Sequence, residues 1–156
     1  MTVNVGFVGC GGIATAHIRR LTQISEAKIV AFCDVVPKKA EDAARLAGGK
    51  AYSSLQEMLN KEKLDAIYVC VPPFAHGFEP DIVERSINLF VEKPVALTME
   101  MAKKIEEAIE KAGVLCSVGY MWRYLDTTTL AKQILEENGP IGMVEGLYID
   151  PYCCLL

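Results

Sequence analysis

The sequence predicts an α/β fold in which a doubly wound parallel sheet carries helices on both faces. Segments with the pattern of strands alternate with segments with the pattern of helices along the 156 residues. The connections between the strands are too long for hairpins, which favours parallel crossovers. Two strand segments, residues 28–33 and 65–71, are continuous apolar runs, as expected of parallel strands that are covered on both faces. These observations together indicate the layered α/β class.

The N-terminal half is divided by residues that favour helix starts and stops. Gly48 and Gly49 end a helix, because glycine readily adopts the backbone conformation of a helix C-terminus. Ser54 and Glu57 form a capping box that opens a short helix. The expected elements of this half are a strand at 2–8, a helix at 13–24, a strand at 28–33 and a helix at 37–47.

The C-terminal half continues the same alternation. Pro72 and Pro73 stop a buried strand, and Thr98 caps a helix that Gly113 ends. The expected elements are a strand at 65–71, a helix near 76–86, a strand at 88–91, a helix at 99–112, a strand at 114–118, a helix at 126–138 and a strand-like segment at 143–149.

Composition excludes several classes of protein. Hydrophobic residues make up 51% of the chain, enough to build a core. The net charge is −4 and no basic block is present, so we expect no nucleic-acid partner. No apolar run reaches the roughly 18 residues of a membrane span, and no signal segment opens the chain. We therefore expect a cytoplasmic protein without a membrane partner.

The six cysteines do not predict a metal site. They form no CxxC pair, and Cys10, Cys33, Cys70 and Cys116 each lie in or beside an expected strand. The simplest interpretation is reduced, small, buried side chains. The final residues, 153–156, match a prenylation box by letter, but no polybasic stretch precedes them, so we expect no lipid anchor.

A glycine-rich turn is the strongest motif in the sequence. It follows the first strand and opens the first helix, which is the context that gives the GxGxxA pattern its meaning. The first glycine permits the tight turn, the second lets a pyrophosphate approach the backbone, and the alanine lets helix and strand pack closely. The helix N-terminus offers free N–H groups to phosphates. The residues of this predicted dinucleotide cradle are Gly9, Cys10, Gly11, Gly12, Ile13 and Ala14.

Asp34 supports the same prediction. It follows the second strand, where a Rossmann-type fold places an acid that accepts hydrogen bonds from the adenosine ribose. A carboxylate there repels a 2′-phosphate, so NAD is favoured over NADP. Lys38 and Lys39 follow closely and would weaken this preference if they reach the phosphate; the alternative is that they form a solvated surface at the start of a helix. A methyltransferase that binds S-adenosylmethionine also pairs a glycine turn with such an acid, and the motifs that follow favour a dehydrogenase instead.

Three further segments, 71–76, 92–94 and 119–124, complete a family signature. With the glycine turn, they make the chain resemble the glucose–fructose oxidoreductase and inositol dehydrogenase family (Gfo/Idh/MocA) as far as about residue 149. The resemblance implies a nicotinamide-dependent oxidoreductase that acts on a sugar, polyol or inositol. Members of this family commonly associate, so a homo-oligomer is also implied.

The resemblance assigns a cofactor contact to the segment that follows the third buried strand. Val71, Pro72 and Pro73 stand at the carboxyl edge of the sheet, where open α/β folds bind ligands. The family places His76 beside the cofactor, whereas a polar residue at a helix start is the alternative. Phe74 stands where many members have asparagine, which implies the loss of a polar contact.

The resemblance assigns the chemistry to Lys93. It implies that Lys93 contacts the substrate hydroxyl near the nicotinamide and assists proton transfer, because a lysine in a water-poor cleft can take and release protons near neutral pH. Glu92 lies beside it, and the resemblance implies that both residues also contact the cofactor; an ordinary surface ion pair between the two is the alternative. Arg123 is implied to lie near the cofactor, or else to be a surface or capping arginine.

The expected domain organisation follows from the same resemblance. Residues 1–124 are expected to form the dinucleotide-binding domain, and 125–156 a linking helix and the first strand of a largely absent substrate domain. The resemblance implies that this second domain supplies an aspartate and a histidine, and the sequence has only His17 and His76. We therefore expect the 156-residue chain to bind cofactor with little or no turnover. A non-catalytic regulator that senses a dinucleotide is the alternative function.

Overall fold

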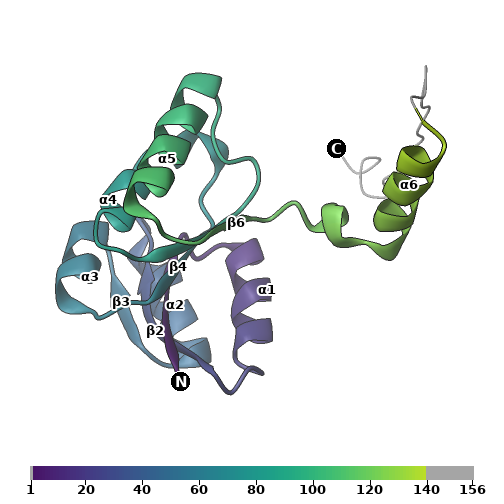
Figure 1. Cartoon of the computed structure of the whole chain (residues 1–156). Helices are drawn as coiled ribbons and strands as arrows, with labels where there is room; N and C mark the ends of the chain where they lie inside the picture. The colour runs from purple at the N-terminus through teal and green to yellow at the C-terminus, as the bar shows by residue number, and fades with distance from the viewer. Residues whose placement is uncertain (1, 140–156) are drawn as a thin grey trace, which may run out of the picture. The chain divides into compact units, whose positions relative to one another are not determined.

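The computed structural model describes residues 2–139 and contains a six-stranded sheet in which every strand pair is parallel (Figure 1). The strand order is β3-β2-β1-β4-β5-β6, the order of a Rossmann-type doubly wound fold. The predicted fold class is therefore confirmed. The strands are β1 (Val3–Val8), β2 (Ala27–Cys33), β3 (Lys50–Tyr52), β4 (Ala66–Val69), β5 (Asn88–Val91) and β6 (Cys116–Val118).

Helices cover both faces of this sheet (Figure 1). The first two helices pack through Ala14, Ile18 and Ala40 into one core cluster. The next three pack into the other cluster, to which Met58 and Ile82 belong. The helices are α1 (Gly12–Leu21), α2 (Pro37–Ala47), α3 (Leu55–Lys61), α4 (Glu79–Val83), α5 (Met99–Ala112) and α6 (Asp126–Glu137), with short 3₁₀ turns η1 (Pro73–Ala75) and η2 (Met121–Tyr124).

The central strand β1 is buried on both faces, as its apolar sequence predicts. Phe7 is fully buried, and its ring stacks on Phe32 of β2 and on Tyr68 of β4, at centroid distances of 5.9 and 5.1 Å. Stacked rings of this kind stabilise neighbouring strands beyond the area that they bury. These contacts fix β1 between β2 and β4. The turn that follows β1 therefore lies between the carboxyl ends of β2 and β4.

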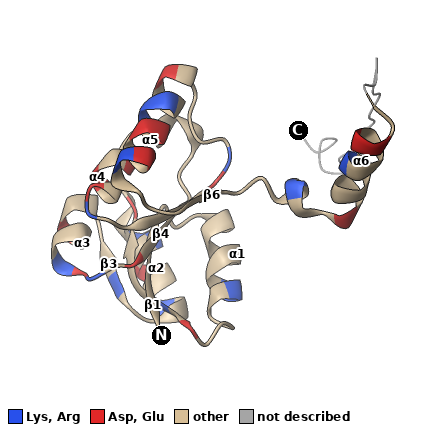
Figure 2. Cartoon of the chain, in the orientation of Figure 1, with Lys and Arg blue, Asp and Glu red and all other residues tan. Residues whose placement is uncertain are grey.

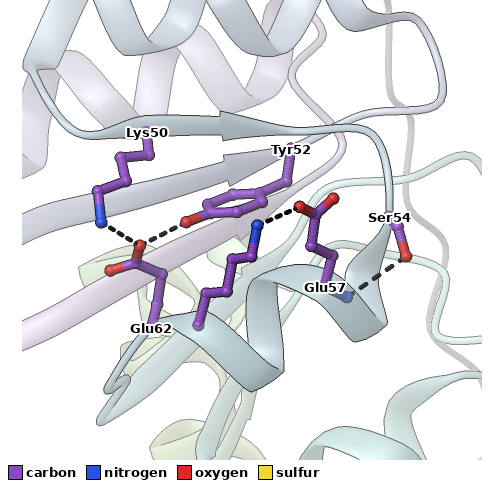
Figure 3. Close-up of polar contacts among 6 residues, drawn as sticks. Lys50, Tyr52, Ser54, Glu57 and Glu62 are labelled. Carbon is purple, nitrogen blue, oxygen red and sulfur yellow. Dashed lines mark hydrogen bonds and ion pairs between the residues drawn. The ribbon is translucent and has the colours of Figure 1, made fainter.

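The short edge strand β3 was not expected from the sequence, because three residues with a single buried side chain give no strand pattern. Tertiary contacts stabilise it (Figure 3). The Tyr52 hydroxyl donates to Glu62 Oε1 at 2.5 Å, and Lys50 Nζ lies 2.8 Å from the same oxygen. Glu62 immediately follows α3. These contacts therefore join β3 to the end of α3.

The helix expected near residues 76–86 is wrong in extent. The structure has the turn η1 before it, and α4 begins only at Glu79 and ends at Val83. Gly77 has a φ of +126°, a conformation that interrupts a helix. The backbone therefore turns between η1 and α4.

The predicted N-cap residues of α3 and α5 are present, whereas the Glu57 carboxylate of the expected capping box pairs with Lys61 at 2.6 Å. The Ser54 side chain accepts the N–H of Glu57 at 3.4 Å, and Thr98 Oγ1 accepts the N–H of Met101 at 3.3 Å. Gly113 ends α5 in the left-handed conformation, with φ of +66°. Figure 2 shows acidic and basic residues mixed along α5, as expected for the solvated face of a surface helix.

The chain forms two compact units, one up to Tyr120 and one from Met121 onward. The second contains η2 and α6 among its described residues. The strand-like segment at 143–149 and the prenylation-like end at 153–156 lie outside the described residues. None of the helices within residues 2–139 has the length and apolar character required to cross a bilayer.

The cap of α5 gives a test of the fold. Replacing Thr98 with alanine removes the acceptor for the Met101 N–H, and we expect the free energy of unfolding to fall by about 1 kcal/mol. Thr98→Ser keeps the hydroxyl and should stay near the wild-type value in urea denaturation. Equal losses for both variants would contradict the role of this cap.

Candidate functional site: a cleft at the carboxyl edge of the sheet

A cleft of about 590 Å³ lies where β1, β2 and β4 end. Open α/β sheets bind their ligands at this edge, near the strand where the order reverses. Among the predicted site residues, those that line the cleft are Gly9, Gly11, Asp34, Val71 and Pro72.

Two glycines of the turn, Gly9 and Gly11, line the cleft and have different roles. Gly9 has a φ of +84°, and a Cβ there would lie 2.6 Å from the carbonyl oxygen of Cys70. Gly11 has an ordinary φ of −81°, and a Cβ there would meet no protein atom within 4 Å. Gly9 is therefore required by the protein backbone, whereas Gly11 leaves open space at the start of α1. The N–H groups of a helix N-terminus favour anions such as phosphate.

The other residues of the turn shape it without lining the cleft. Ala14 is fully buried, which lets α1 approach the sheet closely. The Cys10 side chain is buried, and its backbone N–H points to the Asp34 carboxylate. Gly12 opens α1, and Ile13 is 46% exposed.

Asp34 is fixed by two backbone donors. Its Oδ2 accepts the N–H of Cys10 and its Oδ1 accepts the N–H of Val36, both at 2.8 Å. The carboxylate therefore ties the glycine turn to the loop after β2 while it lines the cleft. Of the two neighbouring lysines, Lys39 lines the cleft, whereas Lys38 pairs with Asp42 at 2.8 Å.

Residues that follow β3 and β4 form a second part of the cleft lining, called its wall, and several of them were not expected from the sequence. Phe74 is 77% exposed at this wall. Gln56 Nε2 donates to Asp81 Oδ2 at 3.0 Å, joining the starts of α3 and α4. No local pattern indicates this pair, because its members come together only when α3 and α4 pack on the sheet. The other residues of the wall are Ser53, Ser54, Leu55, Ala75 and Phe78.

His76 lies in the interior and does not line the cleft. Its side chain is 1% exposed, and Nδ1 lies 2.5 Å from Oε1 of the fully buried Glu79. The other oxygen of Glu79 accepts the N–H of Gly77 at 2.7 Å. The pair links η1, which begins at Pro73, to α4. His76 therefore stabilises the segment that joins η1 to α4 and contributes no side-chain surface to the cleft.

Glu92 and Lys93 follow β5, do not line the described cleft, and do not form an ion pair with each other. Glu92 is buried and pairs with His17 of α1 at 2.8 Å, and the Lys93 side chain is exposed. The bond between Lys93 and Pro94 is cis. Arg123 lies in η2, in the second unit, with an exposed side chain.

Three of the cysteines are buried as expected at or near the cleft, and Cys116 on the edge strand β6 is exposed, which corrects the expectation for that residue. Burial raises the pKa of Cys10 to about 12, with Asp34 adding to the effect. Burial likewise raises the pKa of Cys33 to about 11 and that of Cys70 to about 12. The thiols are therefore neutral at physiological pH. Within residues 2–139 no cluster of three His, Cys, Asp or Glu side chains is arranged to hold a metal ion.

The strand order, the glycine turn and the acid after β2 define a dinucleotide-binding Rossmann domain. Comparison with known families agrees: the chain belongs to the Gfo/Idh/MocA oxidoreductase family with an NAD-binding Rossmann fold, whose model matches residues 3–120. The resemblance seen in the sequence and the prediction of an NAD-binding fold are both confirmed. Membership of this family favours the dinucleotide-binding dehydrogenase over the alternative of a methyltransferase that binds S-adenosylmethionine.

Individual relatives are dehydrogenases of sugars and inositol. An inositol 2-dehydrogenase from Burkholderia cenocepacia is 34% identical over 91% of this chain and 43% of its own length. A glucose-6-phosphate 3-dehydrogenase from Bacillus subtilis is 28% identical over 86% of this chain and 38% of its own length. The WlbA dehydrogenase from Chromobacterium violaceum, crystallised with NADH and UDP-GlcNAcA, is 26% identical, with a TM-score of 0.82 over 88% of this chain and 40% of its own. The chain thus spans less than half the length of these relatives.

The two glycines of the turn form a matched pair of variants. Gly11→Ala should leave the free energy of unfolding within about 0.5 kcal/mol of wild type, because the added methyl meets no protein atom. It should weaken NADH binding at least about tenfold, because the methyl occupies the phosphate space. Gly9→Ala should instead destabilise the fold by about 2–5 kcal/mol, through backbone strain and overlap with Cys70. Denaturation and NADH fluorescence titration measure both effects, and a Gly11→Ala protein that binds NADH normally would contradict this cradle.

The buried thiols predict a loss of stability in alkali. An ordinary thiol ionises near pH 9, and folding raises the pKa of Cys10, Cys33 and Cys70 to between about 11 and 12. Their stabilisation is therefore complete below pH 9 and is lost as the pH rises toward 12. Each thiol contributes a slope of up to about 1.4 kcal/mol per pH unit to the free energy of unfolding. Urea denaturation from pH 8 to 11 measures this slope, which Cys33→Ala should reduce; an unchanged slope in that variant would refute the assignment.

Proposed function

We propose that this chain is the cofactor-binding part of an NAD-dependent dehydrogenase that oxidises a carbinol of a sugar, polyol or inositol. The observation that supports this most directly is the open space above Gly11, which adjoins the Asp34 carboxylate in the same cleft. A linked pyrophosphate and ribose need these two features side by side.

The residues of the cleft suit the parts of NAD. The N-terminus of α1 and the N–H groups of the glycine turn would hold the pyrophosphate. Asp34 uses one acceptor position on each oxygen for Cys10 and Val36, and a carboxylate has about four such positions. Two positions therefore remain for the ribose hydroxyls. The apolar side chains of Val35 and Phe74, both largely exposed beside the cleft, would pack against the flat adenine ring.

Lys93 is the residue that we propose for proton transfer. NAD supplies the hydride acceptor when bound, and the hydroxyl proton of the substrate must leave as the carbinol is oxidised. Lys93 follows β5 at the carboxyl edge of the sheet, and its exposed ammonium group is available to a substrate placed there. Its amine would accept the hydroxyl proton of the substrate as the carbinol is oxidised.

We expect the 156-residue chain by itself to bind NAD with little turnover. Its relatives are more than twice as long as the part that matches. The residues that we assign to NAD lie in the described cleft, and Lys93, which we assign to the substrate, does not line it. The substrate class is therefore proposed from the names of the relatives, and the cofactor from the cleft itself.

Cofactor preference tests the assignment of Asp34. In Asp34→Asn, the ratio of the NADPH and NADH dissociation constants should shift by about tenfold toward NADPH, because the carboxylate no longer repels a 2′-phosphate. Asparagine keeps one acceptor oxygen and so loses one of the two contacts to Cys10 and Val36, and the ratio cancels any general damage from that loss. Lys39→Ala should weaken NADPH more than NADH, and Lys38→Ala, outside the cleft, is its control. An unchanged ratio in Asp34→Asn would remove that residue from the proposal.

Turnover of a longer protein that contains this chain tests the chemistry. Lys93→Met keeps the aliphatic stem but removes the amine, so kcat on a polyol or sugar should fall by about a hundredfold or more. NADH affinity should be retained, since Lys93 does not line the cleft. A wild-type protein that binds NADH but oxidises no member of a polyol and sugar panel would favour a dinucleotide-sensing regulator.

A further inference from the structure

A buried carboxylate lies at the end of β5, directly before the proposed proton-transfer residue. Glu92 is 8% exposed. Its Oε1 lies 2.8 Å from His17 Nε2, and its Oε2 accepts the backbone N–H of Lys93 at 3.1 Å. The two oxygens of one carboxylate therefore connect α1 to the backbone of Lys93.

The space around this carboxylate is closely filled. A Cβ at Gly119, the residue after β6, would lie 3.0 Å from Oε1 of Glu92 and 3.1 Å from Oε2. A methyl group there would require the carboxylate to shift by a few tenths of an ångström. Glu92 is thus held between α1, the end of β5 and the end of β6.

The imidazole of His17 is itself fixed by aromatic rings. It lies at centroid distances of 5.5 Å from Tyr68 and 5.0 Å from Phe90, the latter edge-on. Those two rings stack on each other at 4.6 Å across β4 and β5. Because ring contacts of this kind have a preferred geometry, the sheet sets the direction in which Nε2 points.

We propose that His17 is a positioning residue for Lys93. His17 fixes the Glu92 carboxylate, which holds the Lys93 backbone N–H, so that the lysine leaves the sheet edge at a set point. The helix α1 begins at the glycine turn, so it contacts both the proposed cofactor cradle and, through Glu92, the backbone of Lys93. The importance of this link to catalysis rests on the proposed function of Lys93.

The physical reason is the cost of a buried carboxylate that loses a partner. Such a group is strongly destabilised in place and moves toward water. Without the His17 contact, Glu92 would therefore leave its position and release the Lys93 N–H. Neighbouring amides depend on the sheet instead: Glu92 N–H donates to Val69 O at 2.8 Å and Gly119 N–H to Val91 O at 2.9 Å.

Amide hydrogen exchange in the 156-residue chain, followed by NMR, separates these effects. His17→Phe keeps a ring against Tyr68 and Phe90 but removes the nitrogen. We expect exchange at Lys93 to become at least about tenfold faster, with the Glu92 and Gly119 amides changed less than about twofold. His17→Gln places an amide nitrogen near the position of Nε2 and should restore slow exchange at Lys93.

Three outcomes would overturn the proposal. The exchange rate at Lys93 could be unchanged in His17→Phe, the rates of all three amides could rise equally in that variant, or His17→Gln could fail to restore slow exchange at Lys93. If His17→Phe does not fold, Gly119→Ala replaces it, because the added methyl shifts the same carboxylate. Exchange should then become faster at the Lys93 amide and change little at the Glu92 amide. Exchange is measured without cofactor, and NADH titration of the same variants is separate. Loss of NADH binding in the wild-type chain would therefore refute the proposed function while leaving the positioning result intact.

Discussion

The close approach of the turn after β1 to the end of β4 is the constraint on which the rest of the site depends. Gly9 donates its N–H to Cys33 O at 2.8 Å on one side, and on the other it leaves no room for a Cβ against Cys70 O. This contact brings the ends of three adjacent strands together. The start of α1, the loop after β2 and the loop after β4 then surround one cleft. A larger residue at this position would separate these segments.

The carboxylates in and near the cleft form hydrogen bonds that hold the backbone of the surrounding loops. Asp34 accepts two N–H groups from different loops, and Glu79 holds the segment that begins with His76. Each carboxylate therefore stabilises the loop geometry that presents the cleft. The buried thiols of Cys10, Cys33 and Cys70 add small neutral side chains where charged ones would require further partners. The charged side chains that line the cleft are Asp34, Lys39 and Asp81.

Local sequence signals predicted the elements that depend on local interactions. The strand Asn88–Val91 and the helix Pro37–Ala47 agree with expectation residue for residue, and Ser54 and Thr98 cap the helices that follow them. Errors arose where tertiary contacts decide the outcome. The strand at Lys50–Tyr52 depends on Glu62, and the region after Pro73 is divided by Gly77. Neither effect leaves a periodic pattern in the sequence.

The sequence by itself determined the α/β class, the glycine turn at residues 9–14 and the acid at position 34, because these depend on short-range spacing and on the conformational freedom of glycine. Only the tertiary structure decided that Glu92 pairs with His17 and not with Lys93, that His76 lies behind the cleft wall, and that Lys39 and not Lys38 lines the cleft. These partners are set by how helices pack on a twisted sheet, which brings together residues far apart in the chain and gives no signal along it.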